Sequence, residues 1–224
     1  MSRKYIVTGA LGALGQAVSA KLRSDGHAVC GIDLAQAMSA STGETIGGVD
    51  LTDEAAVAAA YASAMEILGG LDGVANVAGG FLWETIVDGA VASWDRMYAM
   101  NVRTALISSR AALAHLSAGG SIVNIGAAAA QNAAAGMGSY AASKAGVMAL
   151  TESLADELRG CQVRVNAVLP TILDTPQNRA DMPDADVSGW VTLDAAASAI
   201  AFLLSPAAAA ITGTGVKLSL GTAS

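Results

Sequence analysis

Charged residues, aromatic residues and cysteines are scarce in this chain of 224 residues. The two cysteines, Cys30 and Cys161, are too few for a disulfide framework, so we expect a reducing compartment and a cytoplasmic protein. The two histidines, His27 and His115, have no second His or Cys at the spacing of metal ligands. The sequence therefore predicts no metal site.

Basic residues are also in the minority, and long apolar runs are absent. Twelve Lys and Arg stand against 19 Asp and Glu, which gives a net charge of −7 and argues against nucleic acid as a partner. Apolar runs are interrupted by charges or turn formers before they reach the length of a membrane-spanning helix, so no membrane partner is predicted. The chain enters a glycine-rich turn after residue 8, and we expect no cleavable signal peptide before that turn.

Small apolar side chains are abundant instead. The chain has 50 Ala and 25 Gly, and its hydrophobic content, which includes the Ala but not the Gly, is 53%. Such side chains suit a close approach of helices to a sheet rather than a thick aromatic core. The length suits one compact unit, and no linker, charge block or repeat interrupts the chain, so we expect residues 1–224 to form a single domain.

Strand and helix patterns alternate along the chain. Predicted strands cover residues 4–8, 28–33, 71–77, 121–125, 163–169 and 216–220, with one more short strand before Asp50. Predicted helices cover residues 13–25, 52–68, 93–116, 140–158 and 193–204. This alternation is typical of an α/β fold with a parallel sheet of about seven strands and helices on both faces.

A glycine-rich turn follows the first predicted strand. Gly9, Gly12 and Gly15 precede a helix, an arrangement in which the backbone can approach a pyrophosphate at the helix N-terminus. Asp33 ends the second strand, where its carboxylate can accept the ribose hydroxyls and repel a 2′-phosphate. No Arg or Lys occurs between residues 34 and 48. The pattern favours NAD(H) over NADP(H), and the alternative is a plain tight turn with a solvated Asp33.

Tyr140 and Lys144 form a candidate acid–base pair. They are four residues apart at the start of a predicted helix, so they share one helical face. A nearby ammonium, together with a nicotinamide cation, favours the phenolate. Lowering the pKa of the phenol by about three units requires roughly 4 kcal/mol. By itself, a Tyr followed by a Lys four residues later is common.

In order and spacing, the motifs of the whole chain resemble those of the short-chain dehydrogenases/reductases. The matching pieces are residues 8–15, Asp50, residues 76–79, Asn101, the pair Tyr140 and Lys144, residues 170–175 and residues 211–213. The resemblance implies a Rossmann-like, doubly wound sheet and a nicotinamide-dependent oxidoreductase acting on a small-molecule substrate. Tyr140 is then the proton donor or acceptor, Lys144 holds the nicotinamide ribose and lowers the pKa of Tyr140, and Asn101 supports a water relay.

The same resemblance implies a wider set of cofactor-binding residues. Asp50 is expected at the adenine and Thr175 at the carboxamide. The remaining members of the set are Leu11, Ala13, Leu14, Leu34, Leu51, Ala78, Gly79, Gly80, Pro170 and Ile172, besides the turn glycines, Asp33, Tyr140 and Lys144.

The chain departs from the family pattern at the catalytic serine. The usual positions of that serine, in front of Tyr140, hold Ala127 and Ala128. Loss of one such donor costs roughly 100- to 1000-fold in comparable oxyanion sites. Either the substrate does not need the donor, or the chain is an NAD-binding family member with little or no catalytic activity.

One branch of the family departs in the same way. The chain is similar to the dihydropteridine reductases at residues 12–15, 77–80, 136–137, 168–170 and 173–176. That branch implies NADH and a quinonoid dihydropterin, a conjugated hydride acceptor that needs less polarisation than an isolated ketone. The two readings of the substrate, a small carbonyl or alcohol and a quinonoid compound, both stay open.

Three aromatic residues are candidates for the substrate pocket. Phe81 and Trp83 follow a predicted strand at its carboxyl end, where open α/β sheets bind ligands. Trp190 ends the segment 177–189, which is the candidate lid. The predicted helices 93–116 and 140–158 carry apolar residues on more than one face, so we expect them to pair two copies in a homodimer or homotetramer.

Overall fold

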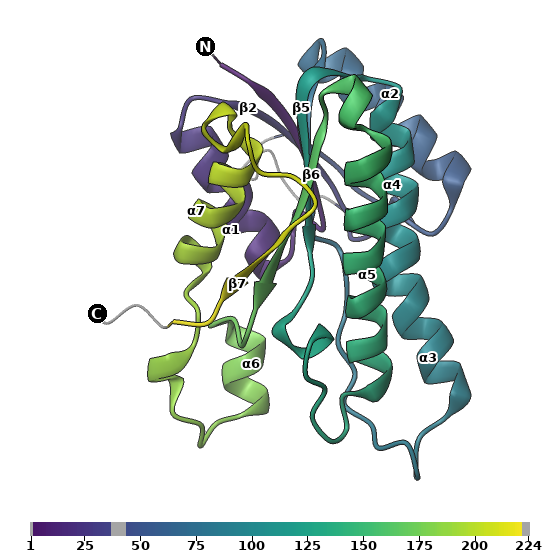
Figure 1. Cartoon of the computed structure of the whole chain (residues 1–224), viewed down its shortest axis with the longest axis vertical. Coiled ribbons are helices and arrows are strands. Elements are labelled where there is room, and N and C mark those ends of the chain that lie inside the picture. The colour runs from purple at the N-terminus through teal and green to yellow at the C-terminus, as the bar shows by residue number, and fades with distance from the viewer. Residues whose placement is uncertain (1, 37–43, 221–224) are drawn as a thin grey trace.

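The computed structural model describes residues 2–36 and 44–220, which form one parallel sheet between two layers of helices (Figure 1). The strands lie in the order β3-β2-β1-β4-β5-β6-β7. Their bounds are β1 (Lys4–Thr8), β2 (Ala28–Ile32), β3 (Thr45–Ile46), β4 (Leu71–Asn76), β5 (Leu116–Ile125), β6 (Arg164–Pro170) and β7 (Gly215–Leu218), and all pairs are parallel. The predicted doubly wound α/β fold is confirmed.

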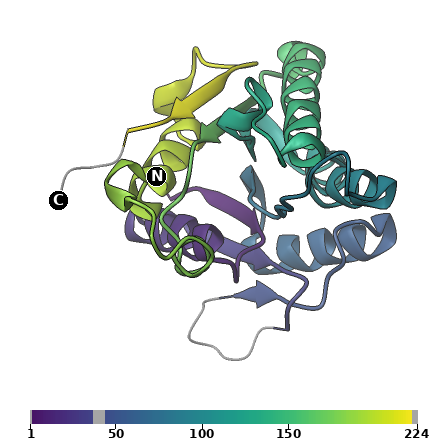
Figure 2. The same ribbon diagram turned by 90° about the horizontal axis from the view of Figure 1, so that it is seen from below.

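Helices cover both faces of the sheet, as the view in Figure 2 shows. On one face, α1 (Ala13–Ser24) packs against α7 (Leu193–Leu204). On the other face lie α2 (Glu54–Leu68), α4 (Thr104–Leu113) and α5 (Gly138–Glu157), with α3 (Val91–Tyr98) against α5. The short helix α6 (Pro176–Asp181) follows β6. Alternate residues of β1 serve the two cores, with Val7 on the α1 side and Ile6 on the α2 side.

A crevice arises where the strand order reverses. β1 is flanked by β2 on one side and by β4 on the other. The chain therefore leaves the carboxyl ends of β1 and β4 in opposite directions, and open α/β sheets bind ligands at such a point. In Figure 1 this edge of the sheet faces the lower end of the molecule.

The predicted helix 93–116 is wrong in its outline. It is divided into α3, a π-helical turn (Ala99–Arg103) and α4, which ends at Leu113. The side chain of Asn101, in the π turn, is bonded to the backbone of Gly80. A π turn inserts one extra residue into a helix, and such turns occur often at functional sites. Beyond α4, Leu116 already belongs to β5, five residues earlier than the predicted strand 121–125.

A buried polar network fixes α4 and α5 on the sheet. Asn76 donates to the Asn124 amide oxygen over 2.9 Å and to the Ser109 hydroxyl over 3.0 Å. Its own amide oxygen accepts from Ser108 over 2.6 Å. Asn124 in turn donates to the Thr151 hydroxyl on α5 over 2.9 Å. Because burial in a dry core strengthens such bonds, the network sets the position of α5.

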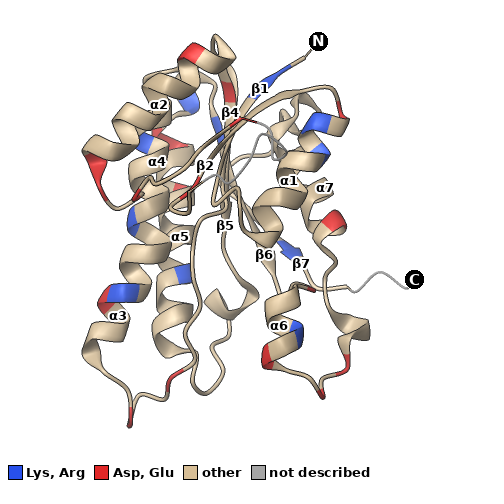
Figure 3. Ribbon diagram, turned by 180° about the vertical axis from the view of Figure 1, so that it is seen from behind, with Lys and Arg blue, Asp and Glu red and all other residues tan. Residues whose placement is uncertain are grey.

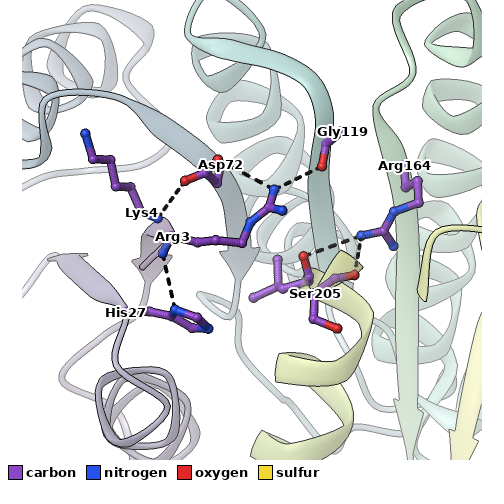
Figure 4. Close-up of polar contacts among 8 residues, drawn as sticks. Arg3, Lys4, His27, Asp72, Gly119, Arg164 and Ser205 are labelled. Atoms are coloured by element: carbon purple, nitrogen blue, oxygen red, sulfur yellow. Dashed lines mark hydrogen bonds and ion pairs between the residues drawn. The ribbon is translucent and has the colours of Figure 1, made fainter. Parts of the chain in front are cut away.

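Two arginines lie at the amino ends of the strands, opposite the crevice, and bond to neighbouring carbonyls (Figure 4). Arg3 donates to the Gly119 carbonyl over 3.0 Å and lies 3.6 Å from the carboxylate of Asp72. Arg164 donates to the carbonyls of Leu203 and Ser205, at the end of α7, over 2.7 and 2.9 Å. These bonds satisfy carbonyls that a helix end leaves without partners. Across residues 2–36 and 44–220, every helix is too short or too polar to cross a bilayer.

Candidate active site

A cavity of about 710 Å³ lies at the carboxyl ends of β1, β2 and β4. Twelve residues predicted to bind the cofactor line it: Gly9, Gly12, Ala13, Leu14, Gly15, Asp33, Leu34, Asp50, Leu51, Ala78, Gly79 and Thr175. Residues far apart in the sequence thus meet where the strand order reverses. The other predicted residues, Leu11, Gly80, Tyr140, Lys144, Pro170 and Ile172, do not line the cavity: Pro170 is buried in β6 and Ile172 is 38% exposed elsewhere.

The glycine-rich turn presents bare backbone to this cavity. Gly9 has a φ of +64°, a conformation that side chains disfavour, and a Cβ there would lie 2.8 Å from the Ala78 nitrogen. A Cβ at Gly15 would lie 2.0 Å from the Gly9 carbonyl oxygen. Positions 9 and 15 are therefore closed to side chains, and α1 begins at Ala13. The residues present fit a dinucleotide, because a pyrophosphate can approach the backbone and the helix N-terminus together.

Asp33 is tied to the turn. Its carboxylate accepts from the Leu11 backbone N–H over 2.8 Å and from the Ala35 N–H over 2.9 Å. These bonds hold the carboxylate at the cavity and also fix Leu11, so Asp33 is both a lining residue and a brace. Residues 37–43 of the segment without Arg or Lys lie outside the described residues.

Asp50 and Thr175 have local partners. The Asp50 carboxylate accepts from the hydroxyl and the N–H of Thr52 over 2.7 and 2.8 Å, and these bonds lower the pKa of Asp50. Thr175 caps α6, since its hydroxyl accepts from the Asn178 N–H over 3.0 Å. Both residues therefore meet the cavity in fixed orientations.

Tyr140 and Lys144 lie in the first turns of α5, beside the cavity. The Lys144 ammonium donates to the Ile125 carbonyl over 2.8 Å and lies 5.8 Å from the centroid of the Tyr140 ring. Burial raises the pKa of Tyr140 to about 12 and lowers the pKa of Lys144 to about 8. The predicted lowering of the phenol pKa is thus not produced by the chain's own groups, because burial disfavours both charged forms.

Asn101 joins the two sides of the site. Its amide oxygen accepts from the Gly80 N–H over 3.0 Å, and its amide nitrogen donates to the Gly80 carbonyl over 3.1 Å and to the Ser143 hydroxyl over 3.0 Å. A Cβ at Gly79 would lie 2.6 Å from the Asn101 amide oxygen and 3.4 Å from the Lys144 nitrogen. The structure therefore brings Asn101 and Lys144 together around a glycine that lines the cavity.

The serine positions and the aromatic candidates differ in placement. Ala127 is 3% exposed after β5, and neither it nor Ala128 carries a hydroxyl. Phe81 and Trp83 are 54% and 60% exposed, and the Phe81 ring lies edge-on against Tyr140. Trp190 is only 5% exposed, and none of the three aromatic residues lines the cavity. The placement of Trp190 differs from the expected pocket wall because the adjoining Val191 pairs with Leu173 and draws the segment inward.

Sequence reasoning missed part of the cavity wall. The missed lining residues are Val49, Thr52, Val77, Met100, Thr104, Pro176 and Gln177. Most of them adjoin predicted residues: Met100 precedes Asn101, and Pro176 follows Thr175. Chain neighbourhood was therefore a usable signal. Within the described part of the chain, no group of three or more His, Cys, Asp or Glu side chains could hold a metal ion.

Comparisons with known proteins agree with this geometry. The family model described as short chain dehydrogenase matches residues 3–186. The 2-(S)-hydroxypropyl-CoM dehydrogenase 3 of Xanthobacter autotrophicus is 32% identical, over 96% of this chain and 94% of its own length. Among solved structures, the ligand-free aldohexose dehydrogenase of Thermoplasma acidophilum has a TM-score of 0.90 and 27% identity, covering 98% of this chain and 93% of its own.

A second solved structure bears on the cofactor. A short chain dehydrogenase from Burkholderia cenocepacia, in complex with NADP, has a TM-score of 0.83 and 29% identity, over 97% of this chain and 96% of its own. Relatives of this fold therefore bind nicotinamide cofactors. The likeness to the dihydropteridine reductases stays a prediction.

Proposed function

The chain belongs to the short-chain dehydrogenase family, and from that premise we propose that it is an NAD(H)-dependent oxidoreductase acting on small carbonyl compounds or the matching alcohols. The observation that carries the proposal is the pair of half-buried Tyr140 and buried Lys144 beside a cavity whose glycine turn fits a dinucleotide. The cofactor, when bound, supplies or accepts the hydride.

Tyr140 handles the proton. With a pKa raised to about 12, its hydroxyl is protonated at neutral pH and can donate to the oxygen of a carbonyl as that oxygen gains negative charge. In the alcohol-to-carbonyl direction the phenolate oxygen of Tyr140 must accept the proton of the alcohol. Positive charge nearby is needed to stabilise that phenolate. Lys144, one helical turn away, is the chain's own source of that charge, and we assign it a second role in holding the nicotinamide ribose.

Asn101 positions the pair. Its side chain forms hydrogen bonds with Gly80 and Ser143, so it holds the segment after β4 against α5. Because the Asn101 side chain is used in these bonds, a water relay would have to use the backbone of the π turn (Ala99–Arg103).

The preference for NADH rests on Asp33. Its carboxylate is held at the cavity by two backbone N–H groups. A 2′-phosphate placed there meets a like charge, whereas ribose hydroxyls meet an acceptor.

An alternative is a protein that binds NAD(H) with little or no turnover, and Ala127 and Ala128 favour it because they provide no second donor. Oxidation of NADH with a panel of carbonyl acceptors, including a quinonoid dihydropterin, tests the proposal. Turnover of any acceptor supports it, and normal NADH binding without turnover of any of them contradicts it and supports the alternative.

Self-association and a cytoplasmic location complete the proposal. The outer face of α5 is lined by exposed Ala142, Ala145 and Ala149, which allow a second helix to approach closely. Cys30 is buried and Cys161 is exposed, and both are free thiols, as suits a reducing compartment.

A further inference from the structure

We propose that this site selects a flat, electron-poor aromatic carbonyl compound, which stacks on Phe81 and Trp83 and places its reacting oxygen at Tyr140. The inference rests on the proposed function, since it names the substrate class of the same site. The contacts of the two rings, the missing donor and the local charge each support it.

Phe81 connects the candidate stacking surface to the acid. Its ring lies edge-on to the Tyr140 ring, with centroids 4.9 Å apart and an interplanar angle of 83°. More than half of the Phe81 side chain, 54%, stays exposed. An apolar ring next to the proton donor and open to solvent leaves a surface that a substrate ring can cover.

Trp83 is exposed but held in place. A Cβ at Gly136 would lie 2.2 Å from the indole ring, so the ring occupies space that only a glycine leaves free. The Gly136 carbonyl also accepts from the Glu84 N–H over 2.8 Å, which fastens the segment after β4 to the loop before α5. The indole therefore has one side against backbone and the rest, 60% of the side chain, open.

Phe81 and Trp83 stand two residues apart in a segment without helical turns. Phe81 contacts Tyr140 and Trp83 contacts Gly136, so both rings lie against the stretch 136–140. Ile86 and Val87, further along the same segment, are exposed as well, at 74% and 92%. Contiguous exposed apolar surface marks binding sites, and here it begins at the proton donor, so a substrate is the occupant that its position favours.

The missing donor narrows the chemistry. Bound NADH would supply the hydride to the carbonyl carbon, and the C=O π pair would move to oxygen as the cofactor is oxidised. Tyr140 would give its proton to that oxygen and would regain a proton from solvent. With Ala127 and Ala128 in place of a second donor, a carbonyl beside another electron-withdrawing group reacts most readily, because that group shares the developing charge.

Local charge disfavours an anionic substrate. Residues 81–90 contain Glu84 and Asp88 and no basic residue. Residues 177–189 contain three Asp and one Arg, and that Arg179 is paired with Asp174 through two bonds of 2.5 and 2.8 Å. Figure 3 shows acidic residues at the lower end of the molecule, below α3 on one side and around α6 on the other. A neutral ring suits this mouth better than a phosphate or sulfonate.

The test compares three ketones with NADH at saturation. The first is 1-phenyl-1,2-propanedione, the second is 1-cyclohexyl-1,2-propanedione, and the third is 1-phenyl-2-propanone. The first and second differ in the ring, which in the phenyl dione is flat and conjugated with the adjoining carbonyl, and the first and third differ only in the activating carbonyl. We expect kcat/KM to be highest for the phenyl dione, by about tenfold over the cyclohexyl dione, the scale of two aromatic contacts.

Two variants locate the effect. Phe81→Leu and Trp83→Leu keep apolar bulk and remove a ring, and each should reduce the phenyl preference by about 3- to 10-fold. Phe202→Leu is the matched control, because Phe202 is a 46% exposed aromatic on α7, and it should leave the preference unchanged. Equal kcat/KM for the two diones, or an unchanged preference in both ring variants, overturns the inference.

Binding separates this inference from the proposed function. Calorimetry of both diones with NADH-saturated Tyr140→Phe protein measures stacking without turnover. Tighter phenyl binding that weakens in Phe81→Leu supports the inference even if no ketone is turned over, an outcome that contradicts only the proposed function. Turnover of the diones with no phenyl preference in binding or kcat/KM leaves the proposed function intact and overturns the inference.

Discussion

The ring of Phe81 meets the ring of Tyr140 edge-on, with centroids 4.9 Å apart. This contact joins the segment that leaves β4 to the first turn of α5, so the candidate acid is held from both sides of the crevice. The same cover removes water from the phenol, and burial raises the pKa of Tyr140 to about 12. Packing and acid–base chemistry are therefore linked at one residue.

The preference for NADH over NADPH should depend on the charge of Asp33. The affinity for both cofactors should depend on the hydrogen bonds of the Asp33 carboxylate. Asp33→Asn keeps an acceptor for the Leu11 N–H and removes the charge, so NADPH binding should improve relative to NADH by about tenfold. Asp33→Ala should also reduce the difference in affinity between NADH and NADPH. It should weaken the binding of both cofactors, because the Leu11 N–H loses its acceptor. Titration of both cofactors into the three proteins measures this, and tighter NADPH than NADH binding by the unmodified chain contradicts it.

Stability should depend on pH through Lys144. Burial lowers its pKa from 10.5 to about 8, so between these values the unfolded chain binds more protons than the folded chain. The free energy of unfolding therefore rises with pH in this window, by up to about 1.4 kcal/mol per pH unit. Tyr140, whose pKa is raised from 10.0 to about 12, acts in the opposite direction only above its ordinary value.

Urea unfolding of the unmodified chain and of Lys144→Met, at about pH 8 and about pH 9.5, checks this dependence. The difference in unfolding free energy between the two proteins should shift in favour of the unmodified chain as the pH rises. An identical pH slope for both proteins contradicts the lowered pKa of Lys144.

The buried network around Asn76 should contribute to stability. Asn76→Ala removes one hydrogen-bond partner from each of Ser108, Ser109 and Asn124, and the unfolding free energy should fall by about 2 to 4 kcal/mol. Arg110→Ala removes only an exposed ion pair to Glu54 at 3.5 Å and should cost about 0.5 kcal/mol or less. Chemical denaturation of both variants provides the comparison, and equal losses speak against the network.

Association should depend on the outer face of α5. Ala149→Arg places a long charged side chain on that face and should yield monomers, while Ala62→Arg, on the exposed face of α2, should not. Light scattering at micromolar concentration reads the mass directly. A monomeric unmodified chain refutes the proposed pairing.

Much of the site was predictable from the sequence because its signals are local. The glycine turn, Asp33 at a strand end, and Tyr140 with Lys144 one turn later are all short-range patterns, and the structure places them around one crevice. The strand and helix alternation likewise predicted the parallel sheet, since each element carries its own periodicity.

What the sequence did not predict depends on contacts between distant segments. The division of the helix 93–116 follows from Asn101 bonding to Gly80, and no helix breaker marks it. The burial of Trp190 depends on the pairing of Val191 with Leu173. The raised pKa of Tyr140 arises from burial of its side chain in the folded protein, which the spacing of residues in the sequence does not predict.

Single-turnover hydride transfer by Tyr140→Phe is the most direct test of Tyr140 as the acid. The substitution removes the hydroxyl and keeps the ring, so NADH binding should change little while the transfer rate falls by about 100-fold or more. Ser139→Ala, which removes the neighbouring hydroxyl, should stay within about threefold of the unmodified chain. If Tyr140→Phe keeps near-full activity, the proton comes from water or from the substrate, and the account of this site is wrong.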